Sequence, residues 1–212
     1  MKNANSKLTV SNPNRFVSRA GLKLQAALDA FEIDVRGMTC ADFGCNVGGF
    51  TDCLLQNGAA KVYAIDTGYG ELAWKLRKDS RVVVMERTNA LYCDVPERVN
   101  LVTIDVAWTP QVLSVPAARR WLKAGQTPAP QNSQGTADTP PGRIISLLKP
   151  HYEYKKLHGK APPAVLSPVQ SAEVCLDVSR QLAEIGCSVK AVMQSVLLGK
   201  GGNREFVFLL EV

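Results

Sequence analysis

A glycine-rich turn between a predicted strand and a predicted helix constrains this chain most. Residues 39–53 read TCADFGCNVGGFTDC, an apolar run followed by glycines and then by a helical pattern that starts at Phe50. Glycine allows a ligand to approach the backbone closely and allows positive φ. Such a turn presents free N–H groups at a helix N-terminus, beside the carboxyl end of a strand. Open α/β sheets bind nucleotides at that place.

The spacing within the turn indicates which nucleotide it holds. The pattern Asp42-x-Gly44-x-Asn46-x-Gly48 is not the G-x-G-x-x-G of a dinucleotide binder, because Asn46 stands at the second glycine. It is typical of the D-x-G-x-x-x-G turn that holds S-adenosylmethionine, although a plain structural turn remains the alternative. The turn residues expected to contact this cofactor are Asp42, Gly44, Cys45, Asn46, Gly48, Gly49 and Phe50.

Alternating strands and helices predict an α/β fold with a mostly parallel sheet and helices on both faces. Two last strands flank the run GKGGN, which favours an antiparallel hairpin near the sheet edge. A proline at 150 is expected to end the fifth strand and to open a basic, histidine-bearing loop. The predicted strands are 39–43, 61–65, 81–85, 101–104, 143–148, 188–196 and 206–210, and the predicted helices are 18–31, 50–56, 71–78, a segment ending at 119–122, and 171–185.

Length and composition favour one domain over residues 15–212, preceded by a flexible basic arm over residues 1–14. Residues 124–142 are rich in Pro, Gly, Thr and Gln and lack periodicity, which predicts a mobile surface insertion. They are not a domain linker, because the sheet pattern resumes directly after them.

The chain shows no signal peptide and no apolar run of roughly 20 residues, so we expect a cytoplasmic protein without a membrane partner. Its six cysteines have no C-x-x-C pair, which favours buried free thiols and no metal site. The net charge is +6, and its clusters suit a polyanion such as nucleic acid, with a merely solvated basic surface as the alternative. The clustered cations are Lys2, Lys7, Arg15, Arg19, Lys23, Arg119, Arg120, Lys123, Lys149, Lys155, Lys156 and Lys160.

Two further residues fit a bound nucleoside. Asp66 stands 22 residues after Gly44 at the tip of the second strand, where a carboxylate can accept both ribose hydroxyls. The alternative is an ordinary turn aspartate at a strand end. Asn89 follows the third strand, where its polar groups can meet an adenine edge.

Ionisable residues converge on the same rim of the predicted sheet. Asp105 and Lys149 follow parallel strands, and Glu205 stands at the start of the antiparallel last strand. Lys23, from the helix before the first strand, can complete the cluster. Four such groups beside a nucleotide turn favour catalysis over the alternative, a pair of structural salt bridges.

From about Phe16 to its C-terminus, the chain resembles the FtsJ-like ribosomal RNA 2′-O-methyltransferases, closest to the haemolysin-like TlyA branch. The resemblance implies a Rossmann-like S-adenosylmethionine-dependent methyltransferase fold with a seven-stranded, mostly parallel sheet and an antiparallel last strand. It also implies a Lys-Asp-Lys-Glu catalytic tetrad on Lys23, Asp105, Lys149 and Glu205. It is carried by FVSRAGLKLQAAL, DFGCNVGGFTDCLLQ, VYAIDTGYGELAWKLR, RVVVMERTNALY, IDVAW, LLKPHYE and GGNREFVFLL.

Two features depart from the TlyA pattern. TlyA-type proteins carry an N-terminal S4 RNA-binding domain, and the short arm before Arg15 cannot contain one. After Asp105 the sequence is VAWTP, where the TlyA branch has a Ser-Phe-Ile type sequence.

The expected reaction is methyl transfer from S-adenosylmethionine to a ribose 2′-hydroxyl of ribosomal RNA, free or in a ribosomal subunit. Lys149 is the candidate base, Lys23 its cationic neighbour, and Asp105 and Glu205 orient them, with Asp105 also near the cofactor. The alternative is an RNA-binding protein without catalysis. An NAD-dependent oxidoreductase is disfavoured by the missing glycine pattern, and a membrane-lytic role by the lack of an amphipathic segment.

Charge and aromatic stacking predict the residues that bind RNA. Trp108 can stack the target base, although a core or lid tryptophan fits its position equally well. The expected RNA-binding residues are Arg15, Arg19, Trp108, Lys155 and Lys156.

Overall fold

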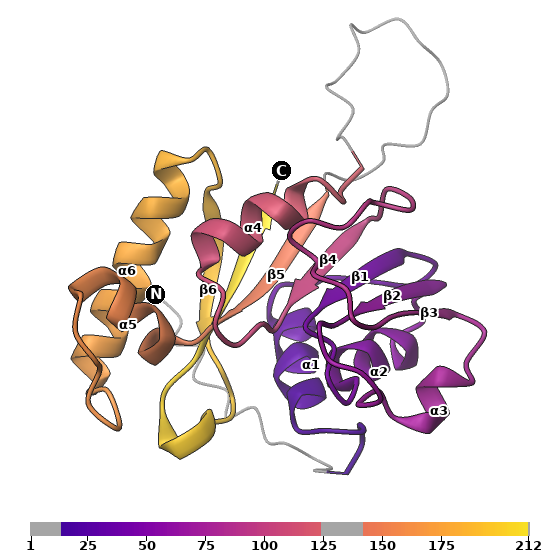
Figure 1. Cartoon of the computed structure of the whole chain (residues 1–212), viewed down its shortest axis with the longest axis horizontal. Coiled ribbons are helices and arrows are strands. Elements are labelled where there is room, and N and C mark those ends of the chain that lie inside the picture. Colours follow the sequence, from indigo (N-terminus) through magenta and orange to yellow (C-terminus); the bar gives the residue numbers. More distant parts are fainter. Residues whose placement is uncertain (1–13, 124–141, 212) are drawn as a thin grey trace, which may run out of the picture.

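The computed structural model describes residues 14–123 and 142–211, and its centre is one twisted seven-stranded sheet (Figure 1). The strands are β1 Thr39–Phe43, β2 Lys61–Ile65, β3 Val82–Met85, β4 Leu101–Ile104, β5 Arg143–Leu148, β6 Val189–Gln194 and β7 Phe206–Glu211. Their order is β3-β2-β1-β4-β5-β7-β6. Neighbours from β3 to β5 are parallel, whereas β7 runs antiparallel to both β5 and β6. The predicted mostly parallel sheet and terminal hairpin are therefore confirmed.

Helices cover both faces of the sheet, as predicted. One apolar core packs α1, α2 and α3 against the sheet, and a second packs α4, α5 and α6 against the opposite face (Figure 1). Strand β1 lies between β2 and β4 near the middle of the sheet, and Cys40 to Phe43 are buried. The helices are α1 Ala20–Ala30, α2 Gly49–Gln56, α3 Trp74–Arg77, α4 Gln111–Arg119, α5 Pro150–His158 and α6 Pro168–Glu184, with a short 3₁₀ turn η1 at Lys200–Gly202.

The segment predicted as a basic loop after β5 is instead the helix α5, so that prediction is wrong. Pro150 occupies the first helical turn, where its missing N–H costs nothing. Lys155, Lys156 and His158 lie in the last turn, where cations favour the helix dipole. Gly159 ends the helix with φ +66°. These end signals outweigh the low apolar content of the segment.

Other element ends differ by a few residues. The helix expected over 71–78 is only α3, and the strand expected over 188–196 is shortened to β6. Helix α6 begins earlier than predicted because Ser167 and Gln170 form a reciprocal capping box. The predicted arm (1–14) and insertion (124–142) lie outside the described residues, apart from Asn14 and Gly142.

Strand register brings the predicted polar residues to one edge of the sheet. Phe43 is aligned with Ile65 in β2 and with Ile104 in β4, so the residues that follow these strands leave the sheet at the same level. On the other side, Leu148 is aligned with Phe206. Lys149 and Glu205 therefore lie beside each other at this same edge, which we call the carboxyl edge.

Candidate functional site

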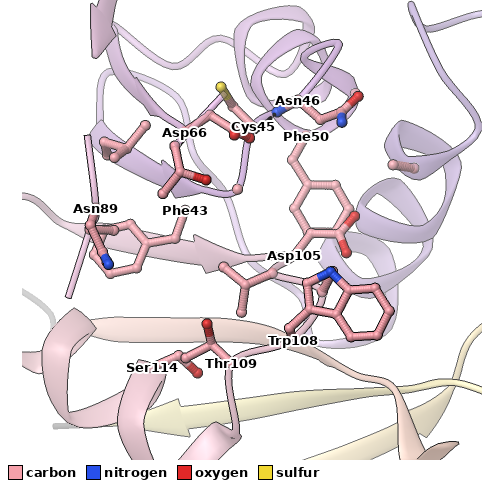
Figure 2. A pocket seen from close by; sticks show the side chains of 18 of the residues that line it. Phe43, Cys45, Asn46, Phe50, Asp66, Asn89, Asp105, Trp108, Thr109 and Ser114 are labelled. Carbon is pink, nitrogen blue, oxygen red and sulfur yellow. Dashed lines mark hydrogen bonds between the residues drawn. The ribbon is translucent and has the colours of Figure 1, made fainter. Parts of the chain in front are cut away.

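A pocket of about 470 Å³ opens at the carboxyl edge, above the ends of β1, β2 and β4. Figure 2 shows Cys45, Asn46 and Asp66 along one wall and Thr109 and Ser114 along the facing wall. Its volume lies in the range of small-molecule sites. The predicted cofactor residues that line it are Gly44, Cys45, Asn46, Gly49, Phe50, Asp66, Asn89 and Asp105.

The glycine turn forms one wall of the pocket, and its shape requires glycine at two positions. Gly44 has φ +80°, and a Cβ there would lie 2.9 Å from the Asp105 carbonyl oxygen. Gly48 has φ +99° at the N-cap of α2, where a Cβ would collide with Leu76. Asn46 also has positive φ, which asparagine tolerates better than most residues. Gly48 shapes the turn from behind, because it is not among the residues that line the pocket.

Both carboxylate oxygens of Asp66 accept hydrogen bonds, one from the glycine turn and one from the turn that follows β2. Oδ2 accepts a hydrogen bond from the Asn46 N–H at 2.8 Å, and Oδ1 accepts one from the Gly68 N–H at 2.8 Å. The second bond is that of an ordinary strand-end turn, which was the alternative interpretation of this residue. Because Asp66 also lines the pocket, it remains available to a ligand there.

Asp42 lies beneath the turn rather than in the pocket. Its side chain is fully buried and accepts hydrogen bonds from the hydroxyls of Thr51 in α2 (2.7 Å) and Thr103 in β4 (3.0 Å). Burial raises the pKa of this carboxyl to about 7, and the two hydroxyl bonds oppose that rise. Asp42 therefore ties β1, β4 and α2 together and is not among the residues that line the pocket.

An ion pair between Lys149 and Asp105 stands in the wall of the pocket. The Lys149 Nζ lies 2.6 Å from the Asp105 Oδ1, in the geometry of an ion pair rather than of an aligned hydrogen bond. Nζ also donates to the Val106 carbonyl oxygen at 3.3 Å. The two side chains are 16% and 18% exposed, so both reach the pocket surface.

A second ion pair joins Lys23 of α1 to Glu205 at the start of β7. Glu205 is only 3% exposed, and neither residue lines the pocket. The connection before β7 wraps this carboxylate closely, because a Cβ at Gly199 would lie 2.1 Å from the Glu205 Oε1. The four predicted tetrad residues thus share one edge, arranged as two cation–carboxylate pairs.

The predicted RNA-binding residues are all exposed, and Trp108 is the one among them that lines the pocket. Trp108 is 79% exposed, lines the pocket, and packs against the Tyr152 ring at 4.6 Å between centroids. Arg19 is exposed at the N-cap of α1, and Arg15 lies over the Phe16 ring. Lys155 and Lys156 are exposed on α5 and do not line the pocket.

Sequence reasoning missed several residues near the pocket. Ser18, Thr109 and Ser114 line it. Tyr152 supports Trp108 from the first turn of α5, and was hidden by the wrong loop prediction. The position of Thr109 and Ser114 soon after β4 was a usable signal, because loops at this edge build the site in open α/β sheets.

All six cysteines are free, and only Cys93 is partly exposed, so the predicted buried thiols are largely confirmed. Burial raises the pKa of the Cys45 thiol in the pocket. In residues 14–123 and 142–211, no group of three or more His, Cys, Asp or Glu side chains is arranged to hold a metal ion. Over the same ranges, no helix has both the length and the apolar character to cross a membrane.

Sequence comparison identifies relatives along almost the whole chain. The sequence model of the FtsJ-like methyltransferases matches residues 16–212. TlyA of Mycobacterium tuberculosis, named a 16S/23S rRNA (cytidine-2′-O)-methyltransferase, is 40% identical over 201 residues, covering 92% of this chain and 68% of the relative. YqxC of Bacillus subtilis is 38% identical over 211 residues, covering 96% and 68%.

Comparison with solved structures also identifies proteins of similar fold. A solved structure from Streptococcus thermophilus is 33% identical with a TM-score of 0.81, covering 95% of this chain and 68% of that one. The N-methyltransferase NodS of Bradyrhizobium japonicum, in complex with S-adenosyl-L-homocysteine, has a TM-score of 0.59 at 14% identity, covering 91% and 86%. The latter likeness concerns the fold alone. Together they confirm the predicted Rossmann-like fold of S-adenosylmethionine-dependent methyltransferases.

Proposed function

The chain belongs to the FtsJ-like methyltransferase family, and we propose that it transfers the methyl group of S-adenosylmethionine to a ribose 2′-hydroxyl of ribosomal RNA. The observation that carries this proposal is the Lys149–Asp105 pair in the wall of the pocket that the glycine turn forms. The RNA substrate and the position on the ribose follow the name of the relative TlyA. We place the reaction in the cytoplasm, in a single domain over residues 15–212.

The residues present fit the cofactor. The turn has no side chain at Gly44, where a Cβ would press on Asp105, so a ligand can approach the backbone there. Asp66 and Asn89 line the same pocket with polar groups suited to a ribose and an adenine edge. Bound there, S-adenosylmethionine supplies a methyl group on a good leaving group. The protein then has to align the hydroxyl and manage its proton.

Lys149 is the group placed to take that proton. Its Nζ would accept the proton of the 2′-hydroxyl, and bound S-adenosylmethionine would supply the methyl group that the hydroxyl oxygen takes up. Asp105, 2.6 Å away, orients the amine and stabilises the ammonium that results. The Lys23–Glu205 pair stands behind the pocket at the same edge and adds a second cation and a second carboxylate to the local field.

The RNA is held by the exposed groups around the pocket. The Trp108 ring, supported by Tyr152, offers a stacking surface for a base beside the reacting ribose. Arg15, Arg19, Lys155 and Lys156 are exposed cations, which supports phosphate contacts by these residues.

Two measurements test the function together. Calorimetry with S-adenosylmethionine should show one site per chain, and 2′-O-methyl mapping of ribosomal RNA should show a mark that is absent from cells lacking this protein. Cofactor binding without any such mark contradicts the proposed substrate. RNA binding without cofactor binding favours the alternative, an RNA-binding protein of the same fold that does not catalyse methylation.

A further inference from the structure

Many surface cations of the described ranges are neutralised by a nearby carboxylate. Arg36 pairs with Asp34, and Arg81 pairs with Asp79. A group at the other end of the sheet from the pocket differs, because its members are exposed and form no ion pair within residues 14–123 and 142–211. We call it the amino-edge cluster, and its residues are Arg98, Arg119, Arg120 and Lys123.

Backbone pairing brings these four cations together. Val99, directly after Arg98, forms a β-bridge with Leu122, directly before Lys123. The Lys123 N–H donates to the Val99 carbonyl oxygen at 2.9 Å. Arg119 and Arg120 end helix α4 just before this bridge. The cluster therefore sits on a fixed part of the structure at the amino end of β4.

The contacts that these side chains make leave their charge uncompensated. The Arg98 guanidinium donates to the Arg120 carbonyl oxygen, and the Arg120 guanidinium donates to the Leu91 carbonyl oxygen at 2.6 Å. The Lys123 Nζ donates to the Asn100 amide oxygen at 3.3 Å. These acceptors are neutral and hold the cations in place without cancelling them. The positive potential thus remains available to an anion.

The nearest carboxylate along the chain is shared. Glu97 accepts hydrogen bonds from Lys61 Nζ at 2.8 Å and from the Tyr63 hydroxyl at 2.7 Å, and these bonds and, more weakly, the charge of Lys123 lower its pKa. One carboxylate that is already paired with Lys61 cannot neutralise four cations, so the amino-edge cluster keeps a local excess of positive charge. A phosphate backbone is the polyanion that fits a row of exposed arginines and a lysine.

The cluster and the pocket lie at opposite ends of the same strands. In Figure 1 the amino ends of β4 and β5 are at the top, near the end of β7. The six residues of β5 separate that level from Lys149 by roughly 20 Å. An RNA that contacts both ends must therefore extend well beyond the nucleotide in the pocket.

We propose that the amino-edge cluster is a second RNA-binding surface, which contacts the phosphate backbone of a folded RNA at a distance from the methylated nucleotide. This inference rests on the proposed function and deepens it. The substrate is a large structured RNA that spans the protein from one sheet edge to the other. A short strand cannot contact the pocket and the amino-edge cluster at the same time.

The test compares two RNAs and two charge-matched variants. The cluster variant carries Arg119→Glu and Lys123→Glu, which leaves the Arg98 and Arg120 hydrogen bonds intact. The control variant carries Arg180→Glu and Lys190→Glu, two exposed cations on α6 and β6 with the same change of net charge. Affinity is measured by fluorescence anisotropy for a folded ribosomal RNA fragment and for an oligouridine of two nucleotides. Even when fully extended, this dinucleotide is too short to reach from the pocket to the cluster.

The cluster variant should bind the folded RNA about tenfold more weakly, and the slope of log affinity against log salt should become shallower by about one to two. The affinity of the cluster variant for the oligouridine and for S-adenosylmethionine should be unchanged. The control variant should bind both RNAs with the affinity of the unaltered protein.

Unchanged binding of the folded RNA by the cluster variant overturns the inference and leaves an acidic protein as the partner to seek. An equal loss in the control variant, or an equal loss on the oligouridine, also overturns it. These results differ from failure of the proposed function, which appears as an unaltered protein that does not bind S-adenosylmethionine or does not methylate the RNA. An unaltered protein that binds neither RNA overturns both proposals.

Discussion

The two ion pairs at the carboxyl edge are built from the same residue types but differ in their surroundings. Lys149 and Asp105 reach the pocket surface with 16% and 18% of their side chains exposed. Lys23 and Glu205 stand behind the pocket, and Glu205 is wrapped so closely by Gly199 that no Cβ would fit there. The first pair can meet a substrate, whereas the second is fixed by folding. Both pairs lie at the carboxyl edge, but the Lys149–Asp105 pair is open to the pocket and can react, whereas the Lys23–Glu205 pair lies outside it and stabilises the structure.

Replacing Lys149 should have the largest effect on activity. Lys149→Ala removes the proton acceptor, so the methylation rate should fall by about 100-fold or more, while the affinity for S-adenosylmethionine changes little. Single-turnover methylation and calorimetry measure the two quantities. Lys61→Ala, which removes an ion-paired lysine at the other end of β2, is the matched control and should leave the rate unchanged. A Lys149→Ala enzyme with normal methylation would contradict the assignment.

Breaking the second pair should mainly reduce stability. Glu205→Ala removes a carboxylate that is only 3% exposed and leaves the mostly buried Lys23 ammonium without its partner, which should lower the free energy of unfolding by about 3 kcal/mol. Asp105→Ala should cost less stability, because Asp105 is 18% exposed in the pocket wall, where water can replace the lost carboxylate. Chemical denaturation of both variants, with Glu205→Gln as a variant that keeps the shape, makes the comparison. Equal losses from Asp105→Ala and Glu205→Ala would erase the distinction between the pairs.

Asp42 extends the comparison to a carboxyl whose hydrogen bonds come from hydroxyl groups. Burial raises its pKa from 3.8 to about 7, so between these values the folded protein holds a proton that the unfolded chain has lost. Unfolding free energy should therefore fall as pH rises through this window, by on the order of 1 kcal/mol per pH unit, and then level off. Asp42→Asn keeps an uncharged group and should remove that decline.

Denaturation curves at several pH values between 4 and 8 measure this effect. Asp94→Asn, at an exposed position, is the control and should retain the decline. An Asp42→Asn protein with the same pH dependence as the unaltered protein would argue against a protonated Asp42.

The smallest effect is expected from Trp108, which lines the pocket together with Lys149 and Asp105. Trp108→Ala should weaken RNA binding by about tenfold through loss of stacking, without changing cofactor affinity or stability, because the ring is exposed. Trp74→Ala, an equally exposed tryptophan on α3, provides the comparison. The apparent KM for RNA, measured for both variants, makes the comparison. An equal rise of KM in Trp108→Ala and Trp74→Ala would contradict a stacking role of Trp108.

Sequence patterns were most reliable where one local signal decides the structure. The strands β1, β2, β4 and β5 have the predicted bounds, because each is a short apolar run that stops at a glycine, a polar residue or a proline. The shared edge of Asp105, Lys149 and Glu205 followed from strand direction alone.

The remaining features depend on tertiary contacts that local patterns do not contain. Nothing in the spacing shows that Asp42 turns toward Thr51 and Thr103, away from the pocket. The division of four charges into Lys149–Asp105 and Lys23–Glu205 depends on how α1 packs, which periodicity does not fix. The prediction of a loop in place of α5 failed for a different reason. The proline and the glycine at the ends of this helix were visible in the sequence, but the many charged residues between them favoured a loop.

The Lys23–Glu205 contact joins positions 182 residues apart in the chain. During synthesis the N-terminal elements emerge first, and the glycine turn with Asp66 can be complete while β7 is still unmade. The contact to Glu205 can form only after the elements from α1 to β6 have all been translated. An enzyme built this way can shape the glycine turn early, yet its full charge arrangement appears only once the residues at the start of β7 have been added.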